Sequence, residues 1–377
     1  MVSNFGLLTT PGLALTQCQP CGLTWETVMG EELKTRVIPI NTPDLFATAV
    51  REAAELLRAG EIVALPTETV YGLAANALDP SAVARIYKAK GRPGNNPIIV
   101  HVASIEMARN CAAEWPKTAS ELARNFWPGP LTLVLPRASL IPDLVTAGGP
   151  TVGLRWPRHP FIQAVIQECG FPLAAPSANP SNRVSPTTAE HVRKSLYGRI
   201  PLIVDGGTCP VGIESTVLDL TVTPVQILRP GMIHAAALEA VIKQPVEYFG
   251  RPGSSAMHQL RSPGQLPRHY APRTPLVVLS WEDDAALLSQ LQTYGLSPKQ
   301  CWIMAHHKVP AAGPWAGITV MPQEPQAYAR ALYGELHACD EKTPAAIVVE
   351  APPSTRGWEA IADRLRRASH RMNPQKG

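Results

Sequence analysis

Two cationic side chains, separated by one residue, are the best suited in this sequence to bind an anion. Lys90 and Arg92 stand where an expected helix ends in a loop rich in glycine and proline. An ammonium and a planar guanidinium at this spacing suit phosphate oxygens, although two cations at a helix C-terminus can also simply complement the helix dipole. Ser177 and Asn179 directly follow a short apolar strand, where they could contact the same anion or form an ordinary turn.

Other candidate residues lie at or inside expected strands. Arg155 and Arg229 each end a strand, so each could reach a pocket or form a surface ion pair. His101 lies inside an apolar strand, where a lone histidine is more often a core residue than a catalyst. Cys18 and Cys21 form one close pair without a second pair of ligands at a suitable distance, so no metal site is expected. P-loop, GxGxxG, HExxH and GxSxG motifs are absent from the sequence.

The composition indicates a globular protein of ordinary polarity. A chain of 377 residues is long enough for two domains. It contains no run of 18 apolar residues, so we expect no membrane span. The net charge of +4 is compatible with an anionic ligand but does not identify one. The seven cysteines are scattered without the spacing of a disulfide framework, which favours the reducing cytoplasm.

The elements that must position these residues are short and of mixed type. A strand at 62–65 leads into a polar turn, then a helix at 82–90 that begins at Asp79 and Pro80, then a strand at 98–102. Further helices are expected at 44–58, 119–126, 161–169 and 187–196, and further strands at 131–135, 152–155, 173–175, 202–205, 215–220 and 226–228. Because strands and helices do not alternate strictly, we predict a sheet of mixed direction.

The pattern changes after residue 242. Residues 243–274 are rich in proline, glycine, serine and basic side chains, which predicts a linker. Regular alternation then returns in 275–377, with strands at 276–279, 302–305 and 347–349 and helices at 283–294, 326–340 and 358–367. That order predicts a small three-layer domain with a parallel sheet. Residues 1–35 are expected to be a poorly ordered extension, with Met29 as an alternative start, which leaves 36–242 as the main domain.

Taken together, the motifs resemble the YrdC-like threonylcarbamoyl-AMP synthases in their long two-domain form. The matching segments are LPTETVYGL (65–73), AKGRPGNNPIIVHV (89–102), WPGPLTLVL (127–135), PSANPSNRVSPT (176–187), VDGG (204–207), ESTV (214–217), LRPG (228–231) and the linker SPGQLPRHYAP (262–272). The resemblance is specific over about 36–242, and weaker beyond 275, where it rests on element order. It implies a YrdC-like mixed, twisted α/β sheet with helices, followed by a small Rossmann-like C-terminal α/β domain.

The resemblance also implies an activity. The family makes L-threonylcarbamoyladenylate and pyrophosphate from L-threonine, bicarbonate and ATP, and is thus a nucleotidyltransferase. Mg²⁺ would enter with ATP. A separate transferase then carries the threonylcarbamoyl group to N6 of the adenosine next to the anticodon of tRNA. No covalent enzyme intermediate is needed, so catalysis can rest on positioning the reactants and neutralising phosphate charge.

The family's site residues carry over to this sequence by motif. Lys90 and Arg92 match its catalytic cations. The positions that resemble its ATP contacts are Lys90, Arg92, Thr146, Ser177, Asn179, Ser185, Arg229 and Tyr270, where Tyr270 is the linker tyrosine that closes over the nucleotide. The positions that resemble its threonine contacts are Thr67, His101, Arg155 and Ser215. Arg155 would pair with the threonine carboxylate in a bidentate manner.

Three other functions compete with this interpretation. The main one is a module that binds double-stranded RNA or tRNA without catalysis, which predicts RNA affinity with a steep salt dependence. The spread of the basic residues and the lack of an aromatic platform argue against it. A carbamoyltransferase of hydrogenase maturation shares a similar core, but would add acylphosphatase-like and zinc-finger regions that this sequence lacks. A non-catalytic scaffold would not need Lys90, Arg92, Ser177 and Asn179 together.

Overall fold

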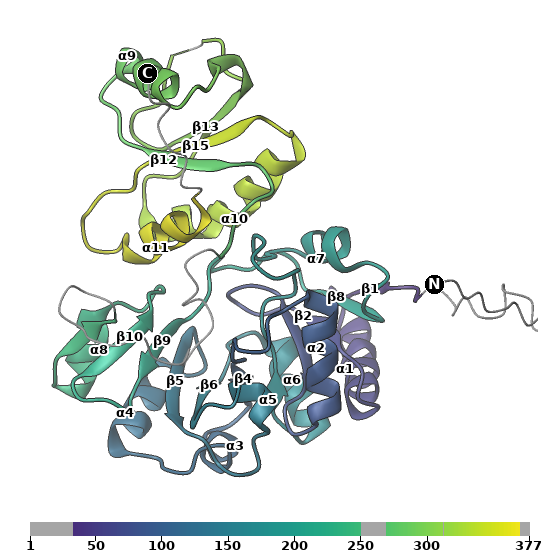
Figure 1. Cartoon of the computed structure of the whole chain (residues 1–377). Coiled ribbons are helices and arrows are strands. Elements are labelled where there is room, and N and C mark those ends of the chain that lie inside the picture. Colours follow the sequence, from purple (N-terminus) through teal and green to yellow (C-terminus); the bar gives the residue numbers. More distant parts are fainter. Residues whose placement is uncertain (1–32, 250–268, 312, 370–377) are drawn as a thin grey trace, which may run out of the picture. The chain divides into compact units, whose positions relative to one another are not determined.

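The computed structural model describes residues 33–249, 269–311 and 313–369. Most of the expected extension at 1–35, the Cys18 and Cys21 pair and most of the expected linker lie outside these residues. Within them the chain forms one sheet of 11 strands and one sheet of 4 strands, each with its own helices (Figure 1). In the part of the chain that the structure describes, every helix is too short or too polar to cross a membrane.

The larger sheet contains both parallel and antiparallel pairs, which confirms the prediction of mixed direction. Its strands lie in the order β1-β8-β2-β3-β7-β4-β6-β5-β9-β10-β11. Parallel pairs such as β4 with β6 occur beside antiparallel pairs such as β5 with β6. The strand bounds are β1 Arg36–Pro39, β2 Val63–Leu65, β3 Gly72–Asn76, β4 Val100–His101, β5 Leu131–Pro136, β6 Thr151–Arg155, β7 Leu173–Ala174, β8 Leu202–Asp205, β9 Thr216–Asp219, β10 Val225–Arg229 and β11 Val246–Tyr248.

Helices follow these strands and begin where capping residues stand. Thr42 accepts a hydrogen bond from the Leu45 amide at 3.2 Å, and Asp79 accepts one from the Ser81 amide at 2.8 Å. Gly91 ends α2 in a left-handed conformation with φ of 58°. The helices of this part are α1 Pro43–Arg58, α2 Pro80–Lys90, α3 Ile105–Asn110, α4 Lys117–Phe126, α5 Asp143–Thr146, α6 Pro160–Cys169, α7 Ala189–Leu196 and α8 Ala235–Ile242.

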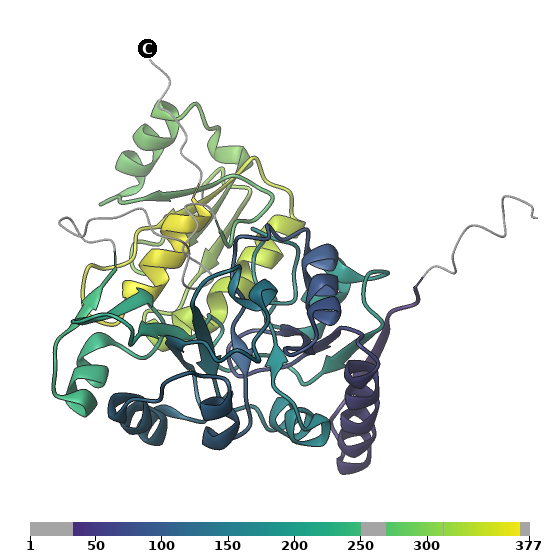
Figure 2. The ribbon, with the colours of Figure 1, turned by 60° about the horizontal axis from the view of Figure 1, so that its bottom comes forward.

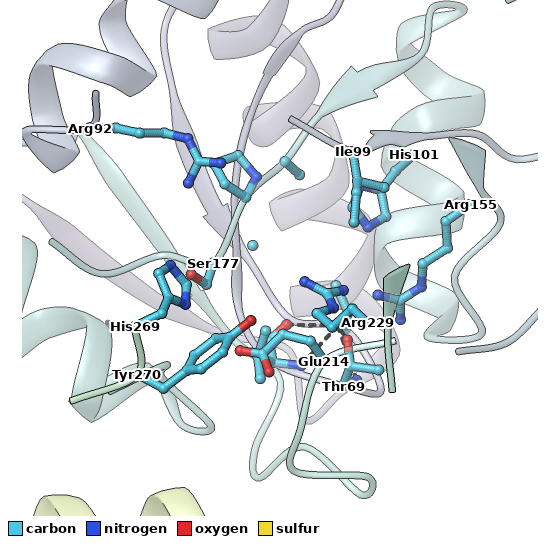
Figure 3. Close-up of a pocket in the computed structure, with 15 residues that line it drawn as sticks. Thr69, Arg92, Ile99, His101, Arg155, Ser177, Glu214, Arg229, His269 and Tyr270 are labelled. Carbon is cyan, nitrogen blue, oxygen red and sulfur yellow. Dashed lines mark hydrogen bonds between the residues drawn. The ribbon is translucent and has the colours of Figure 1, made fainter. Parts of the chain in front are cut away.

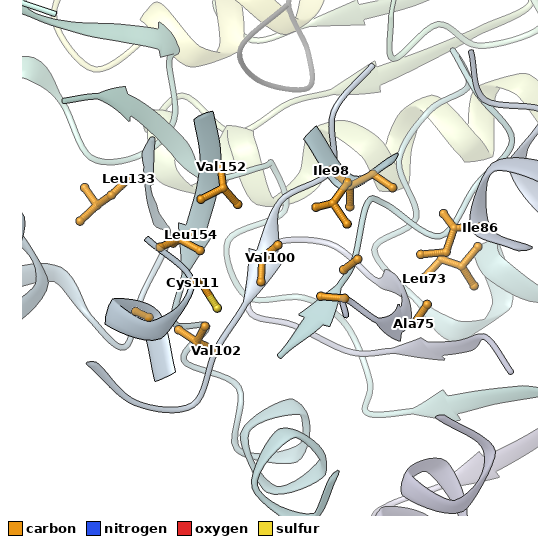
Figure 4. Close-up of a cluster of buried hydrophobic side chains, with 14 of the residues drawn as sticks. Leu73, Ala75, Ile86, Ile98, Val100, Val102, Cys111, Leu133, Val152 and Leu154 are labelled. Carbon is orange, nitrogen blue, oxygen red and sulfur yellow. The ribbon is translucent and has the colours of Figure 1, made fainter. Parts of the chain in front are cut away.

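Alternate residues of the central strands face two different cores. In β2, Ala64 packs into a core with α2, α4, α7 and α8, whereas Val63 and Leu65 pack into a core with α1 and α6. In β3, Leu73 and Ala75 point to the first core, part of which is drawn in Figure 4. The strands are therefore buried on both faces, with helices on each side, as the turned view in Figure 2 also shows.

The second core does not extend along the whole sheet. At the β4, β5, β6 and β9 end, the face opposite α2 and α4 carries a small separate cluster that includes Ile99, Val134 and Val217. Neither α1 nor α6 contributes to that cluster. His101 and Arg155 lie on this same face, because they alternate with Val100 and Leu154, which belong to the first core. The strands thus present polar side chains where those helices leave the sheet uncovered.

The C-terminal part contains a small parallel sheet, as predicted. Its strands are β12 Leu276–Leu279, β13 Cys301–Ala305, β14 Gly317–Val320 and β15 Ala346–Glu350, in the order β12-β15-β13-β14, and all three pairs are parallel. Its helices are α9 Asp284–Thr293, α10 Pro325–Glu341 and α11 Glu359–Ala368. The edge strand β14 was not predicted, because its sequence GITV is short, begins with glycine and is only partly buried.

Strands β3 and β11 also differ from the sequence prediction, which lacked the helices α3, α5 and α8 as well. Gly72–Asn76, the sequence GLAAN, forms the central strand β3, although glycine, alanine and asparagine favour strands poorly. Its burial between β2 and β7 overrides that propensity. Val246–Tyr248 forms β11 and pairs with β10, so the larger sheet continues past the boundary expected after residue 242.

Candidate active site

A cavity opens on the uncovered face of the larger sheet, and residues from distant motifs line it. Figure 3 shows His101 and Arg155 on one side, Arg92 and His269 on the other, and Tyr270 near Glu214. The lining residues are Thr67, Thr69, Val70, Gly72, Arg92, Ile99, His101, Arg155, Ala175, Pro176, Ser177, Glu214, Arg229, His269 and Tyr270. Three arginines and several hydroxyls therefore converge on one hollow, an arrangement suited to a polyanion next to a small polar molecule.

Arg155 is held by a carboxylate that the sequence analysis did not single out. Its Nη2 lies 2.7 Å from Oε1 of Glu68, and both side chains are 5% exposed. Its Nε donates to the Gly129 carbonyl at 3.3 Å. Burial raises the pKa of Glu68, but the Arg155 charge and the hydrogen bonds from Arg155 and the backbone together outweigh burial, so the pKa falls below its ordinary value. Glu68 is thus an anion that orients the guanidinium.

Thr67 begins a tight polar loop between β2 and β3. Its hydroxyl donates to the Val70 carbonyl at 2.6 Å and accepts from the Thr69 amide at 3.1 Å. The Thr69 hydroxyl lies 2.9 Å from the Thr67 hydroxyl. These bonds fix the loop, and Thr67, Thr69 and Val70 all reach the cavity. The turn therefore presents a rigid polar wall beside Arg155.

Lys90 lies beneath the cavity wall, since it is not among the residues that line the cavity. Its ammonium donates hydrogen bonds to the carbonyls of Ser177 and Asn179, and lies 3.4 Å from the Asn179 side-chain oxygen. It is 3% exposed, and burial, together with the Arg92 charge, lowers its pKa well below the ordinary value. The Asn179 amide group donates to the carbonyls of Arg183 and Val184 at 2.8 Å and 3.1 Å. Lys90 and Asn179 together fix the loop that presents Ser177.

Arg92 reaches the cavity from the loop that follows α2. Its Nε donates to the Asn96 carbonyl at 3.1 Å, and its Nη2 donates to the Pro97 carbonyl at 2.7 Å. Burial lowers the pKa of Arg92 to about 10, which leaves it charged at neutral pH. Two backbone carbonyls therefore hold the charged guanidinium of Arg92 at the cavity.

Arg229, the last residue of β10, contacts Ser215, which directly precedes β9. Arg229 Nε donates to the Ser215 carbonyl at 3.1 Å, and its Nη2 donates to the Ser215 hydroxyl at 3.0 Å. Ser215 also pairs with the Thr132 hydroxyl at 2.8 Å. The register of β10 against β9 shifts between Ile227 and Arg229, and this irregularity sets where the Arg229 side chain leaves the strand. Arg229 lines the cavity, whereas Ser215 lies behind it.

Glu214 joins the cavity to the C-terminal domain. It accepts hydrogen bonds from Ser185 Oγ at 2.6 Å, Tyr333 OH at 2.9 Å and Arg364 Nε at 2.8 Å. Burial raises its pKa, but the charges of Arg364 and Arg229 and these hydrogen bonds outweigh burial and lower the pKa to about 2. Ser185 therefore serves as a ligand of Glu214 in this structure and does not reach the cavity.

Tyr270 and His269 cover the cavity from the end of the expected linker. Tyr270 has a φ of 60° and is 1% exposed. The following residue, Ala271, donates its amide to the Asn182 carbonyl at 3.0 Å, and His269 donates its amide to the Arg367 carbonyl at 3.1 Å. The two rings meet edge to face with centroids 4.0 Å apart. Burial raises the pKa of Tyr270 and lowers that of His269 to about 3, so both side chains are neutral at pH 7.

Thr146 is an expected ATP contact that does not line the cavity. It is the last residue of α5, and its hydroxyl donates to the Asp143 carbonyl at 3.3 Å. The structure thus brings Thr67, Arg92, His101, Arg155, Ser177, Arg229 and Tyr270 to one cavity, and leaves Lys90, Thr146, Asn179, Ser185 and Ser215 outside its lining. Among the described residues, no cluster of three or more histidine, cysteine or carboxylate side chains could hold a metal ion.

Sequence reasoning assigned no role to Glu68, Glu214, His269 or Arg364, although His269 stood out as an unusual residue for a linker. Glu68 and Glu214 lie inside segments already noted, but each was passed over because no carboxylate forms an acid–base pair with another. Their partners are arginines instead: Arg155 lies 87 positions after Glu68, and Arg364 lies 150 positions after Glu214. Arg364 lies in the basic helix predicted at 358–367, but the sequence does not show which residues that helix contacts.

Two family models match this chain. Residues 55–231 match the model of Sua5, YciO and YrdC proteins, described as "Telomere recombination". Residues 233–370 match the model described as "Threonylcarbamoyl-AMP synthase, C-terminal domain". The two models follow one another along the chain, the first over the larger sheet and the second over the smaller one.

Curated relatives and a solved structure agree with these models. A threonylcarbamoyl-AMP synthase of Bacillus subtilis (strain 168) is 39% identical over 345 residues, covering 89% of this chain and 98% of the relative. One of Pyrococcus abyssi (strain GE5 / Orsay) is 46% identical over 239 residues, covering 62% of this chain and 69% of the relative. The crystal structure of P. abyssi Sua5 complexed with L-threonine superposes with a TM-score of 0.80 at 37% identity, covering 89% of this chain and 97% of that chain. The similarity therefore runs through both sheets.

Proposed function

The chain belongs to the family of threonylcarbamoyl-AMP synthases, in its two-domain form, and we propose that it acts as a nucleotidyltransferase on L-threonine, bicarbonate and ATP. The products are L-threonylcarbamoyladenylate and pyrophosphate. The observation that carries this proposal is the single cavity in which Thr67 and Arg155 meet Arg92, Ser177 and Arg229. Residues suited to an amino-acid carboxylate (Thr67, Arg155) and residues suited to phosphates (Arg92, Ser177, Arg229) thus line the same cavity.

The reaction joins its substrates in two steps. The neutral amine of threonine attacks the carbon of bicarbonate, whose C–OH bond breaks so that water leaves with the amine proton, or attacks CO₂ that bicarbonate has formed by losing hydroxide, with release of the amine proton. A carbamate results either way. A carbamate oxygen then attacks the α-phosphorus of ATP, and the bond from that phosphorus to the bridging oxygen breaks to release pyrophosphate. Neither step requires a covalent bond to the protein, so its contribution is orientation and charge neutralisation.

The threonine side of the cavity is built around Arg155. A guanidinium has five N–H donors, and the contacts to Glu68 and Gly129 use only part of them. The remaining donors suit the carboxylate of an amino acid. Thr67 and His101 line the same cavity as Arg155, and the P. abyssi relative was crystallised with L-threonine, which supports this assignment.

The nucleotide side is built around Arg92, Ser177 and Arg229. Arg92 and Arg229 supply positive charge for the triphosphate. Lys90 and Asn179 fix the backbone of the Ser177 loop in this structure, and to contact a phosphate oxygen the Lys90 ammonium would have to give up a loop carbonyl. We keep Lys90 and Arg92 as the catalytic cations of the proposal. Thr146, Ser185 and Ser215 would support the site from behind the lining.

Enclosure protects the reactive intermediates. A carbamate and an acyl-phosphate anhydride both decompose in water, so a covered site favours their productive use. Tyr270 and His269 cover the cavity with neutral rings that contribute no charge opposed to the phosphates.

Mg²⁺ is proposed to enter with ATP and to be coordinated mainly by triphosphate oxygens. This fits the donors present, because Glu214 in the lining and Glu68, which lies outside the lining and pairs with Arg155, are each engaged with an arginine. The metal would neutralise phosphate charge as pyrophosphate leaves. Titration of the rate with Mg²⁺ at fixed ATP tests this: saturation near the ATP concentration is expected, and full activity in excess chelator would contradict it.

The decisive experiment is pyrophosphate release with each substrate omitted in turn. Release should require ATP, L-threonine and bicarbonate together. Lys90→Ala and Arg92→Ala should each lower the rate by about 100-fold or more, as for removal of a preorganised charge from a transition state. Lys88→Ala is the matched control, since Lys88 belongs to the same helix but is exposed, and it should retain the normal rate. Near-normal rates for Arg92→Ala would refute the phosphate site.

The wider context of the reaction is part of the proposal. The product would pass to a transferase that modifies N6 of the adenosine beside the anticodon of tRNA, in the cytoplasm. The described cysteines, all of them free thiols, support a reducing compartment. Direct binding of double-stranded RNA or tRNA is the alternative, and it predicts RNA affinity that falls steeply with salt and is independent of threonine.

A further inference from the structure

Arg364 in α11 is one of the largest side chains in the described structure to be fully buried, with an exposure of 1%. Burying an arginine is costly unless charged partners and hydrogen bonds compensate for the lost hydration. An arginine that only stabilised this small domain could keep its guanidinium in water and would avoid this cost. The partners of Arg364 should therefore explain why it is there.

Those partners belong to three separate segments that form the cavity. Arg364 Nε donates to Glu214 Oε2 at 2.8 Å, and Nη2 donates to the Pro230 carbonyl at 3.0 Å. Its guanidinium carbon lies 4.9 Å from the centroid of the Tyr270 ring, within range of a cation–π interaction. Its Nη1 contacts Asp363 Oδ2 at 2.9 Å. One side chain of the C-terminal domain thus contacts the Glu214 loop, the turn after Arg229 and the tyrosine that covers the cavity.

The charge of Glu214 makes this contact important for a triphosphate. Among the described residues that line the cavity, Glu214 is the only carboxylate. An uncompensated carboxylate there would repel phosphate oxygens and would attract Arg229 toward itself. Arg364 supplies the opposite charge from outside the lining, and Tyr333 OH adds a hydrogen bond at 2.9 Å. Glu214 can then support the cavity wall without opposing the ligand.

We propose that Arg364 is a positioning residue for the nucleotide site, which neutralises Glu214 and fixes Glu214, Pro230 and Tyr270 around the phosphates of ATP. The inference rests on the proposed function, because it assumes that the cavity holds a triphosphate. It gives the C-terminal domain a specific part in the reaction: the domain completes the electrostatics of a cavity whose phosphate-binding cations belong to the larger sheet.

The test compares Arg364→Met with Arg364→Met/Glu214→Gln. The single variant leaves a buried anion at the cavity, so the KM for ATP should rise at least about tenfold, with a smaller change in the KM for threonine. The double variant removes both charges and should recover most of the affinity for ATP. Arg366→Met is the matched control, since Arg366 stands in the same helix and contacts Asp363, but its side chain is 67% exposed. It should leave both KM values unchanged.

A purely structural role predicts a different pattern. Arg364→Met would then lower the melting temperature without a selective rise in the KM for ATP, and Glu214→Gln would not rescue it. Either result would overturn the proposal. If Arg364→Met does not fold, Tyr333→Phe keeps the ring and removes one hydrogen bond to Glu214. It should raise the KM for ATP about two- to fivefold, and an unchanged KM for ATP would count equally against the proposal.

Calorimetric binding of a non-hydrolysable ATP analogue separates this inference from the proposed function. If the unmodified protein binds the analogue but releases no threonine-dependent pyrophosphate, the proposed reaction fails while the role of Arg364 can still be measured. The opposite outcome is that the unmodified protein performs the reaction while the double variant binds the analogue no better than Arg364→Met does. The proposed reaction would then stand, and the proposed positioning role of Arg364 would be refuted.

Discussion

Glu68 and Arg155 form a buried ion pair, with Glu68 Oε1 at 2.7 Å from Arg155 Nη2 and both side chains 5% exposed. Strand β6 fixes the backbone of Arg155, and among the described residues this pair and the Gly129 carbonyl hold its head group. A buried pair is no strong source of net stability, yet removing one partner leaves a buried charge without its counterion. The pair therefore makes Arg155 ready to accept a second carboxylate.

Glu68→Gln should destabilise the free protein by about 3 kcal/mol, since Arg155 loses its counterion. The carboxylate of L-threonine should then replace part of the missing charge. Urea unfolding with and without saturating threonine measures this, and threonine should stabilise the variant more than the unmodified protein. Glu190→Gln, which breaks the exposed pair with Arg193, is the control and should change stability by less than about 1 kcal/mol. Equal stabilisation of both proteins by threonine would show that Arg155 does not bind its carboxylate.

Gly231 stands where two chain segments approach too closely for a side chain. A Cβ added there would lie 2.3 Å from the Thr216 amide nitrogen and 2.7 Å from the Ser215 carbonyl carbon. Thr216 is the first residue of β9, so its backbone cannot move without breaking the sheet. Gly231→Ala should cost about 2 kcal/mol or more in unfolding free energy and should displace Arg229.

Gly94→Ala is the matched control for this prediction, because a Cβ there meets no atom within 4 Å. It should leave unfolding free energy within about 0.5 kcal/mol. Comparing urea midpoints and pyrophosphate release for the two variants measures the effect. If Gly231→Ala were as stable and as active as Gly94→Ala, the contact between the turn and Ser215 would not position Arg229.

The sequence could predict where each strand or helix lies and which side chains it contains, but not which residues from distant parts of the chain those side chains contact. Helix α2, its end at Gly91 and strand β8 were predicted closely, because capping and apolar periodicity are local. The convergence of Arg92, Ser177 and Arg229 required the family motifs, since the hollow exists only after the sheet orders its strands. Residue pairs formed across domains, such as Glu214 with Arg364, have no local signature at all.

Burial decided the cases in which local preference was misleading. Strand β3 forms from small residues with poor strand propensity, because it lies between two other strands. Lys90 was expected in the pocket because a lysine at a loop suits phosphate, but the structure gives its ammonium two backbone carbonyls. Such carbonyls cannot be identified from side-chain patterns, because every residue has one.

Glu214 should make stability depend on pH in acid. Its pKa is about 2 in the folded protein against an ordinary value of 4.5. As pH falls, the unfolded chain takes up the proton first, so stability that is present above pH 4.5 is lost as pH falls toward 2. The full effect is about 3 kcal/mol at 1.36 kcal/mol for each pKa unit. The gap in unfolding free energy between the unmodified protein and Glu214→Gln should narrow from pH 6 to pH 3.5, and a constant gap would contradict this.

His191 and His337 form a stacked pair between α7 and α10, with ring centroids 3.9 Å apart and planes at 25°. His337 Nε2 lies 3.1 Å from the Ser185 carbonyl, which fixes that ring. The charged groups around the pair are Glu190, Lys194, Asp340 and Glu341. Burial and the neighbouring His337 lower the pKa of His191 to about 3, and burial lowers that of His337 as well. Both rings are therefore neutral in the folded protein at pH 7.

This pair should make the protein lose stability as pH falls below about 6.5, since the unfolded histidines take up protons before the folded ones do. Each histidine contributes a slope of at most about 1.4 kcal/mol per pH unit. His337→Gln should flatten the fall in urea midpoint between pH 6.5 and pH 5, because it removes one titrating ring and the neighbouring charge that opposes protonation of His191. His234→Gln, a histidine outside the pair, should keep the original slope. A slope in His337→Gln as steep as in the unmodified protein would mean that other groups control the acid sensitivity of this contact.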